Sequence, residues 1–294
     1  MGGYIQTTAG PLHWRDYGGN GRVLVLVHGL GGSVANWDAV GPRMISLGRV
    51  VAVDLPGFGL SPPSHDWGLE THARVLRAFM AEFAPSVTLV GNSMGGLLAE
   101  MVASGSPETV DSLVLISPAT PPRFPDPRIH WPTARRLALQ ATPGIGPVIS
   151  RHFLRSLTPE ELVTLSLETI THKPGRVPMS VVEEFVRLAR VRMQLPWAEE
   201  AVPRTGRSIA AMFRKPSVFV AMIREIQAPT LVIQGIGDHI VSPTAVEWLC
   251  SLRPDWEYVQ MEDTGHTPQL DASIRLLDLV VPWLESSLKH QITA

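Results

Sequence analysis

The stretch Val87-Thr88-Leu89-Val90-Gly91-Asn92-Ser93-Met94-Gly95 joins an apolar run to the pattern Gly-x-Ser-x-Gly, and a helix-like segment, residues 96–104, follows it. This pattern between a strand and a helix is typical of a nucleophilic serine held on a strained turn. Glycine suits the outer positions because neighbouring backbones pass close to a tight turn. The stretch therefore predicts that Ser93 stands clear of a sheet with its hydroxyl exposed. The same pentapeptide also occurs as a structural turn in glycine-rich loops, so its meaning depends on the rest of the chain.

Short apolar runs bounded by turn residues recur along the chain, at residues 23–27, 50–53, 87–90, 113–116 and 231–233. They are rich in valine, isoleucine and leucine and lack polar alternation, which is typical of buried parallel strands. Further strands are predicted towards the two edges, at residues 12–17 and 257–261. Helical patterns alternate with these runs, at residues 70–83, 96–104, 244–252 and 273–288. The sequence therefore predicts an α/β fold with a mostly parallel sheet flanked by helices.

The alternation of strands and helices stops after Ser117. Prolines crowd residues 118–132, and the chain from there to about Gln227 has helical periodicity and no valine-rich runs. Because proline lacks a backbone donor and restricts its predecessor, the prolines at both ends of this block suit stiff hinges. The sequence predicts a first core part (residues 1–117), an inserted helical block (118–227) and a second core part (228–294). The helices predicted in the block cover residues 134–140, 159–170, 180–193 and 208–213.

The composition is that of an ordinary globular protein. With 294 residues, 45% of them hydrophobic, the chain is long enough to bury the core of one large domain. A formal net charge of -2 gives no reason to expect nucleic acid and favours a small neutral or apolar partner. The single Cys250 rules out an internal disulfide framework. No secretory signal or membrane-spanning run is visible, which predicts a cytoplasmic protein. The histidines form no metal-binding pattern and no phosphate-binding loop is present, so neither a metal nor a cofactor is expected.

A nucleophilic Ser93 requires two partners elsewhere in the chain. A serine hydroxyl is a poor nucleophile until a base removes its proton, and an acid must orient that base. In doubly wound sheets such groups sit at the carboxyl ends of strands. His266 and Asp238 each follow a late strand-like run and are predicted as base and acid. The alternative interpretations are a surface loop histidine and an ordinary turn aspartate, and the alternative acids are Asp263 and Asp271.

Attack on a carbonyl also requires donors for the oxygen that becomes negative, and losing one donor costs about 3 kcal/mol. The amide of Met94, at the start of the helix after the serine, is predicted as one donor. The second is predicted in His28-Gly29-Leu30-Gly31-Gly32, with the Leu30 amide preferred. Gly29 is expected to touch the substrate. His28 is expected to brace this loop by hydrogen bonds rather than to act on the substrate.

Together these motifs resemble the α/β-hydrolase superfamily. In the family order, the His-Gly loop follows the third strand of that fold, Asp54-Leu55-Pro56-Gly57-Phe58-Gly59-Leu60-Ser61 follows the fourth, and the serine turn follows the fifth. The acid and the histidine come late, so the motifs span nearly the whole chain. The resemblance implies an α/β-hydrolase fold in which residues 118–227 are a helical cap over the active site. It also implies that Gly57 and Gly59 shape a turn near its mouth.

Members of this superfamily differ in their chemistry. Haloalkane dehalogenases and epoxide hydrolases carry aspartate at the nucleophile position, where this chain has Ser93. Carbon-carbon bond hydrolases of aromatic ring-fission products often share the Gly-Asn-Ser-Met-Gly-Gly turn. They usually have an aromatic residue after the catalytic histidine, where this chain has Thr267, and they place an arginine in the cap to hold a substrate carboxylate.

Candidates for such an arginine lie in the predicted helix at residues 180–193. They are Arg187, Arg190 and Arg192, although two glutamates precede Arg187 at helical spacing and favour solvated ion pairs. The underside of a cap is expected to be apolar, and some of its large side chains are expected to line the pocket. The candidates for this lining are Phe185, Met193 and Met212.

The sequence thus predicts a cofactor-independent serine hydrolase that cleaves small carboxylic esters with an apolar acyl or alcohol group. Two alternatives stay open: a carbon-carbon bond hydrolase of meta-cleavage-type products with the same triad, and a receptor-like protein that keeps the fold and binds a ligand. The sequence leaves the acyl chain length, the alcohol, the stereochemical preference and the oligomeric state open.

Overall fold

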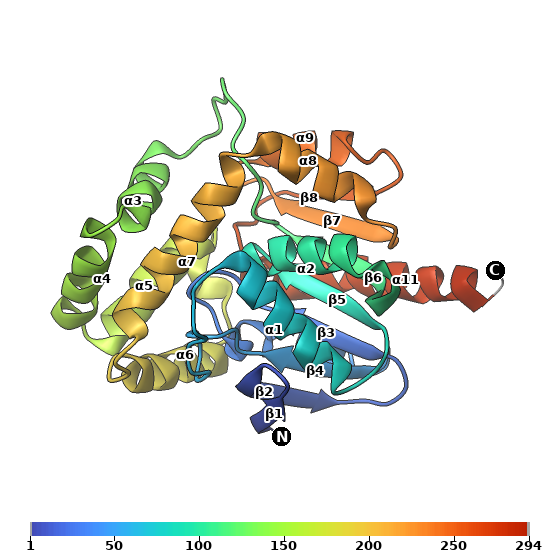
Figure 1. Ribbon diagram of the computed structural model, residues 1–294, viewed down its shortest axis with the longest axis horizontal. Helices are drawn as coiled ribbons and strands as arrows, with labels where there is room; N and C mark the ends of the chain where they lie inside the picture. The colour runs from blue at the N-terminus through green and yellow to red at the C-terminus, as the bar shows by residue number, and fades with distance from the viewer. Residues whose placement is uncertain (1, 293–294) are drawn as a thin grey trace.

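The computed structural model describes residues 2–292, with side chains described through residue 287. One sheet of eight strands in the order β1-β2-β4-β3-β5-β6-β7-β8 forms its centre (Figure 1). The strands from β4 to β8 in this order run parallel, whereas β1 and β2 pair antiparallel at one side. The strands are β1 (Gly2–Thr7), β2 (Gly10–Gly18), β3 (Val23–Val27), β4 (Arg49–Val53), β5 (Val87–Asn92), β6 (Val110–Ile116), β7 (Thr230–Gly235) and β8 (Glu257–Met261).

Both faces of the sheet are covered, which explains why its central strands are apolar without alternation. In β3, Leu24 and Leu26 point to one face and Val25 and Val27 to the other, as the pleat requires. One face packs on α1 (Leu69–Ala81), α2 (Met94–Gly105) and α9 (Pro243–Ser251). The other face packs on the turn η1 (Val34–Trp37) and on α11 (Ser273–Ile292). The predicted α/β-hydrolase fold class is confirmed.

Strand β1 was not predicted. Its residues alternate between exposed and half-buried, and Tyr4 is 63% exposed, so no apolar run marks it. It forms a tight hairpin with β2, with Thr7 opposite Gly10. Strand β2 is therefore second from the edge, while β8 lies at the opposite edge as expected.

Six helices lie between β6 and β7 in the chain. Helices α3, α4 and α7 pack together on the side away from α11, whereas α8 packs against α2 and buries Phe219 and Ile223 in the main core (Figure 1). Helices α4 and α8 were not predicted. Helix α7 begins ten residues before the predicted segment; its first part was missed because Pro203 and Gly206 interrupt the helical pattern of the sequence. The helices are α3 (Trp131–Ala141), α4 (Ile145–Ser156), α5 (Pro159–Ile170), α6 (Met179–Arg192), α7 (Ala198–Phe213) and α8 (Pro216–Glu225). No helix within residues 2–292 is long and apolar enough to cross a membrane.

The core contains one carboxyl group without a partner. Glu100 of α2 is fully buried, and neither of its side-chain oxygens makes a hydrogen bond. Burial raises the pKa of this carboxyl well above its usual value, because the charged form loses its hydration. The folded protein therefore holds Glu100 protonated at a pH where the unfolded chain releases this proton.

Replacing this side chain is expected to change how stability depends on pH. Above the pKa of the unfolded chain the folded state holds the extra proton, so stability falls as pH rises towards the raised pKa. Glu100→Gln cannot ionise, so its free energy of unfolding relative to the wild type is expected to increase as pH rises above about pH 5, by up to about 1.4 kcal/mol per pH unit. Urea unfolding measures this, with the exposed Glu108→Gln as the control. A difference that stays constant with pH contradicts the assignment.

Candidate active site

Ser93 occupies a strained turn between β5 and α2. Its backbone angles, φ 56° and ψ -119°, lie where non-glycine residues rarely occur. Hydrogen bonds from both sides hold this conformation: the Ser93 amide donates to the Ile116 carbonyl at 3.0 Å, and the Ser93 carbonyl accepts from Leu97 and Ala119. The turn therefore presents the serine at the carboxyl end of the sheet, as predicted. Ser93 is only 8% exposed, however, so the expectation that its hydroxyl stands exposed is wrong: the surrounding elements cover the turn.

Glycines surround this turn because other backbones come into contact with it. A Cβ atom on Gly95 would lie 2.2 Å from the Val27 carbonyl oxygen, and one on Gly91 would lie 2.5 Å from the Gly95 carbonyl oxygen. A Cβ atom on Gly29 would lie 2.9 Å from the Cβ atom of Ser93. The loop after β3 thus passes directly beside the serine, and only glycine leaves room for it.

His266 and Asp238 form a buried pair. His266 Nδ1 lies 2.8 Å from Asp238 Oδ2, and the two residues are 4% and 2% exposed. The Asp238 carboxylate also accepts from the amides of Ile240 and Val241 and from the side chain of Gln234. Since a carboxylate accepts, Nδ1 carries the proton and Nε2 of the imidazole is left as the basic nitrogen.

Asn92 links the histidine to the serine turn. Its Nδ2 atom donates to the Ile116 carbonyl and to the His266 carbonyl, each at 3.0 Å. The residue next to Ser93 thereby holds the loop that carries His266, so the structure brings the segments of Ser93, Asp238 and His266 together. Asn92 was not predicted as a site residue, although its place beside the serine was the available signal.

Neither alternative acid pairs with the histidine. Asp263 lies on the surface, where hydrogen bonds from Lys173 and Arg176 lower the pKa of its carboxyl to about 2. Asp271 accepts hydrogen bonds from the backbone amides of His172 and Gly265. It therefore helps to hold the loop that precedes His266 in the chain. The structure thus places both carboxyl groups in other roles.

The loop after β3 carries Gly29, which lies beside the serine, and His28 braces this loop. Burial lowers the pKa of the His28 imidazole to about 4, so the ring is neutral at ordinary pH. Its Nε2 atom accepts from the Leu55 amide at 3.0 Å, and its Nδ1 atom therefore donates to the Gly29 carbonyl at 2.7 Å. The amides of Leu30 and Met94 donate to no other group in the described part of the chain, so both are available as donors.

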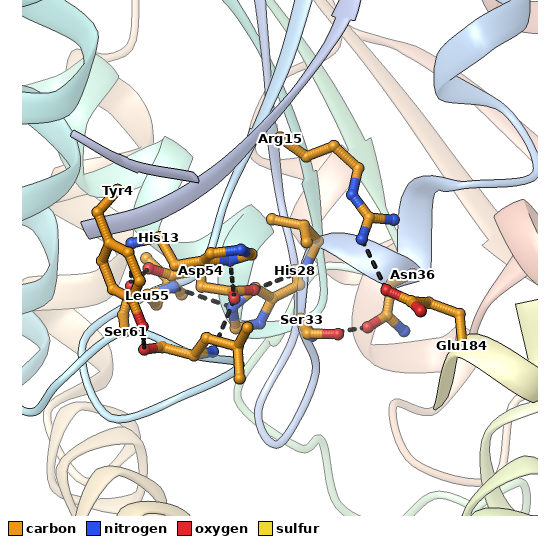
Figure 2. Close-up of polar contacts among 12 residues, drawn as sticks. Tyr4, His13, Arg15, His28, Ser33, Asn36, Asp54, Leu55, Ser61 and Glu184 are labelled. Carbon is orange, nitrogen blue, oxygen red and sulfur yellow. Dashed lines mark hydrogen bonds and ion pairs between the residues drawn. The ribbon is translucent and has the colours of Figure 1, made fainter. Parts of the chain in front are cut away.

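Asp54 holds the neighbouring loop in place (Figure 2). Its fully buried carboxylate accepts from the amides of Val34 and Leu60 and lies 2.7 Å from His13 Nδ1. Gly59 has φ +52°, and a Cβ atom there would lie 1.9 Å from the carboxylate carbon. One buried carboxylate therefore connects β2, the start of η1 and the turn after β4.

The structure separates the three candidate arginines. Arg187 pairs with Glu184, which also binds Arg15 of β2 (Figure 2), and Arg190 pairs with Glu160. The side chains of Arg187 and Arg190 are 56% and 62% exposed, so neither reaches the serine turn.

Of the three candidate arginines, Arg192 alone contacts the loop after β3. It is half-buried, and its Nη1 atom donates to the Gly31 carbonyl at 3.0 Å. Burial lowers its pKa, and it forms no ion pair with the described residues.

The apolar candidates lie in the helical block. Phe185 packs on the small cluster formed by α5 and α6, and Met212 packs against the main core. Met193 directly follows α6 and is half-buried. No group of three or more His, Cys, Asp or Glu side chains within residues 2–287 is arranged to hold a metal ion.

A model of the Alpha/beta hydrolase family matches residues 24–279, so the chain belongs to this family. Lipase 1 of Psychrobacter immobilis is 26% identical over 266 residues, which are 87% of this chain and 76% of that protein. The pimeloyl-[acyl-carrier protein] methyl ester esterase of Klebsiella pneumoniae is 29% identical over 262 residues, 87% of this chain and 91% of that one. A crystal structure of a meta-cleavage product hydrolase from Pseudomonas fluorescens has the same fold, with a TM-score of 0.75 at 22% identity over 98% of each chain.

The link through Asn92 is expected to contribute to stability. Asn92→Ala leaves the buried His266 carbonyl without its donor, which is expected to lower the free energy of unfolding by about 1–3 kcal/mol. Urea unfolding of this variant and of the exposed control Asn20→Ala measures the effect. If the two variants have the same free energy of unfolding, the hydrogen bond from Asn92 to the His266 carbonyl does not stabilise the protein.

Proposed function

We propose that this protein is a serine hydrolase that cleaves carboxylic esters with an apolar acyl or alcohol group through Ser93, His266 and Asp238. The observation that carries this proposal is the buried hydrogen bond of 2.8 Å between His266 and Asp238, on a loop held to the serine turn by Asn92. The names of the relatives, a lipase and an esterase, support ester hydrolysis.

The first half of the reaction forms an acyl-enzyme. His266 Nε2 takes the proton of Ser93 as the hydroxyl oxygen attacks the ester carbonyl, and Asp238 stabilises the imidazolium and holds its orientation. The carbonyl oxygen becomes negative and receives hydrogen bonds from the amides of Leu30 and Met94, which have no acceptor within the described part of the chain. The bond to the alcohol then breaks, and His266 gives its proton to the leaving alkoxide.

Water completes the turnover. His266 takes a proton from water, whose oxygen attacks the acyl carbon, and the same two amides stabilise the second oxyanion. The bond to Ser93 breaks, the serine recovers the proton, and the carboxylic acid leaves. We further propose that residues 118–227 form a cap over this site, that Gly29, Phe185, Met193 and Met212 contribute to the substrate pocket, and that the protein works in the cytoplasm on small esters.

Ser93→Ala tests the proposal directly. The variant is expected to lose at least about 10⁴-fold in kcat for p-nitrophenyl esters, because the nucleophile is gone, while its unfolding free energy changes little. A fluorophosphonate is expected to label the wild type at Ser93 and to leave the variant unlabelled. Retention of most ester turnover in the variant contradicts the triad, and stoichiometric labelling without steady-state turnover indicates a receptor instead.

Arg192 favours a second candidate function, hydrolysis of a carbon-carbon bond in a vinylogous diketone acid. This arginine has no carboxylate partner among the described residues and contacts the loop that carries Leu30 from the end of α6, so its guanidinium is available for a substrate carboxylate. The same serine, histidine and aspartate would serve that reaction. The structural neighbour named a meta-cleavage product hydrolase shares the fold alone.

An assay of such an acid beside short esters separates the two candidates. If the acid is the substrate, Arg192→Gln is expected to raise its Michaelis constant by about tenfold or more, because a charged hydrogen bond is lost. The control Arg187→Gln, whose side chain pairs with Glu184 on the surface, is expected to leave it unchanged. Turnover of esters without any turnover of the acid excludes the second candidate.

A further inference from the structure

Helices α3 and α4 expose several large apolar side chains. Trp131 is 53% exposed and Val148 is 60% exposed, although such side chains usually lie in the core. Phe124, 65% exposed, stacks on Trp131 with ring centroids 6.3 Å apart. Six of the fourteen large apolar side chains that are exposed among the described residues lie between residues 124 and 153. We call these six the apolar face; its members are Phe124, Trp131, Leu139, Ile145, Val148 and Phe153.

The two helices form the outer layer of the helical block. Both pack against α7, and in Figure 1 they lie at the edge of the molecule farthest from the C-terminus. Their exposed sides therefore point away from α7 and away from the sheet. A flat partner can reach this surface without displacing any other element.

The charges on α3 and α4 all have one sign. The two helices contain Arg135, Arg136, Arg151 and Arg155 and no acidic residue, whereas the whole chain has a formal net charge of -2. Arg151 pairs with Glu199 of α7, while Arg135 and Arg155 form no ion pair with the described residues. Positive charge is thus concentrated beside the exposed apolar side chains.

We propose that the apolar face, with Arg135 and Arg155 beside it, forms a docking surface for an anionic phospholipid bilayer. Amphipathic helices with arginine beside tryptophan, phenylalanine and isoleucine lie in the plane of a membrane, with apolar groups between the headgroups and the first methylenes. Trp131 suits the headgroup level, and the guanidinium groups attract lipid phosphates. The exposed aromatic pair favours a bilayer over an acidic protein. An acidic partner that binds the arginines by charge alone leaves Phe124 and Trp131 in water, whereas a bilayer buries them.

Co-sedimentation with vesicles tests the proposal. The protein of 294 residues is expected to sediment with vesicles of phosphatidylcholine mixed with phosphatidylglycerol and to stay in solution with phosphatidylcholine alone. Added salt is expected to release it. Arg135→Gln and Arg155→Gln are each expected to lower the partition coefficient by about fivefold, and Trp131→Ala and Val148→Ser by severalfold.

Matched variants give the controls. The exposed Met179→Ser, which lies on α6, and the exposed Arg224→Gln, which lies on α8, are expected to bind like the wild type. Ser93→Ala is also expected to bind like the wild type, so membrane docking and ester hydrolysis succeed or fail independently. No sedimentation of the wild type with the anionic vesicles overturns the proposal. Binding that depends on the arginines and is unaffected by Trp131→Ala and Val148→Ser also overturns it, and indicates an acidic protein partner.

Discussion

The close contact between the turn at Ser93 and the end of β3 controls the geometry of the whole site. Because Gly95 approaches the Val27 carbonyl without a side chain between them, helix α2 begins against the sheet and Ser93 is forced to a positive φ. The same contact puts Gly29 beside the serine. A site built this way obtains its precision from backbone contacts in the core, which have little freedom to move.

The fold was predictable from the sequence wherever both sides of an element are covered. Strands β3 to β7 are mostly apolar and lack polar alternation because helices pack on each face, and periodicity detects such runs well. Strand β1 escaped prediction because one side of it faces water. Helix α7 escaped in part because Pro203 and Gly206 disfavour a helix locally, whereas packing against α3 and α4 stabilises one.

The candidate site also has a part that the sequence predicts and a part that it does not. Ser93, Asp238 and His266 each follow a strand, so topology alone predicts that they meet at one edge of the sheet. The three candidate arginines lie on one helix, α6. Their spacing in the sequence does not show which face of that helix contacts the loop after β3. Arg192 lies about 140° around the helix axis from Arg187, which places it on Gly31 while Arg187 stays in water. Only tertiary packing determines that rotation.

The position of the helical block in the chain has a consequence for synthesis. Ser93 and its glycine turn belong to the first core part, whereas β7, β8 and the pair of Asp238 and His266 come after six intervening helices. Chains emerge from the ribosome in order, so the serine that we propose as the nucleophile leaves the exit tunnel well before the imidazole proposed to activate it. Under the proposed function, a nascent or truncated polypeptide that ends before β7 therefore carries an unreactive alcohol, and chemical competence arises only when β7 and β8 have joined the sheet.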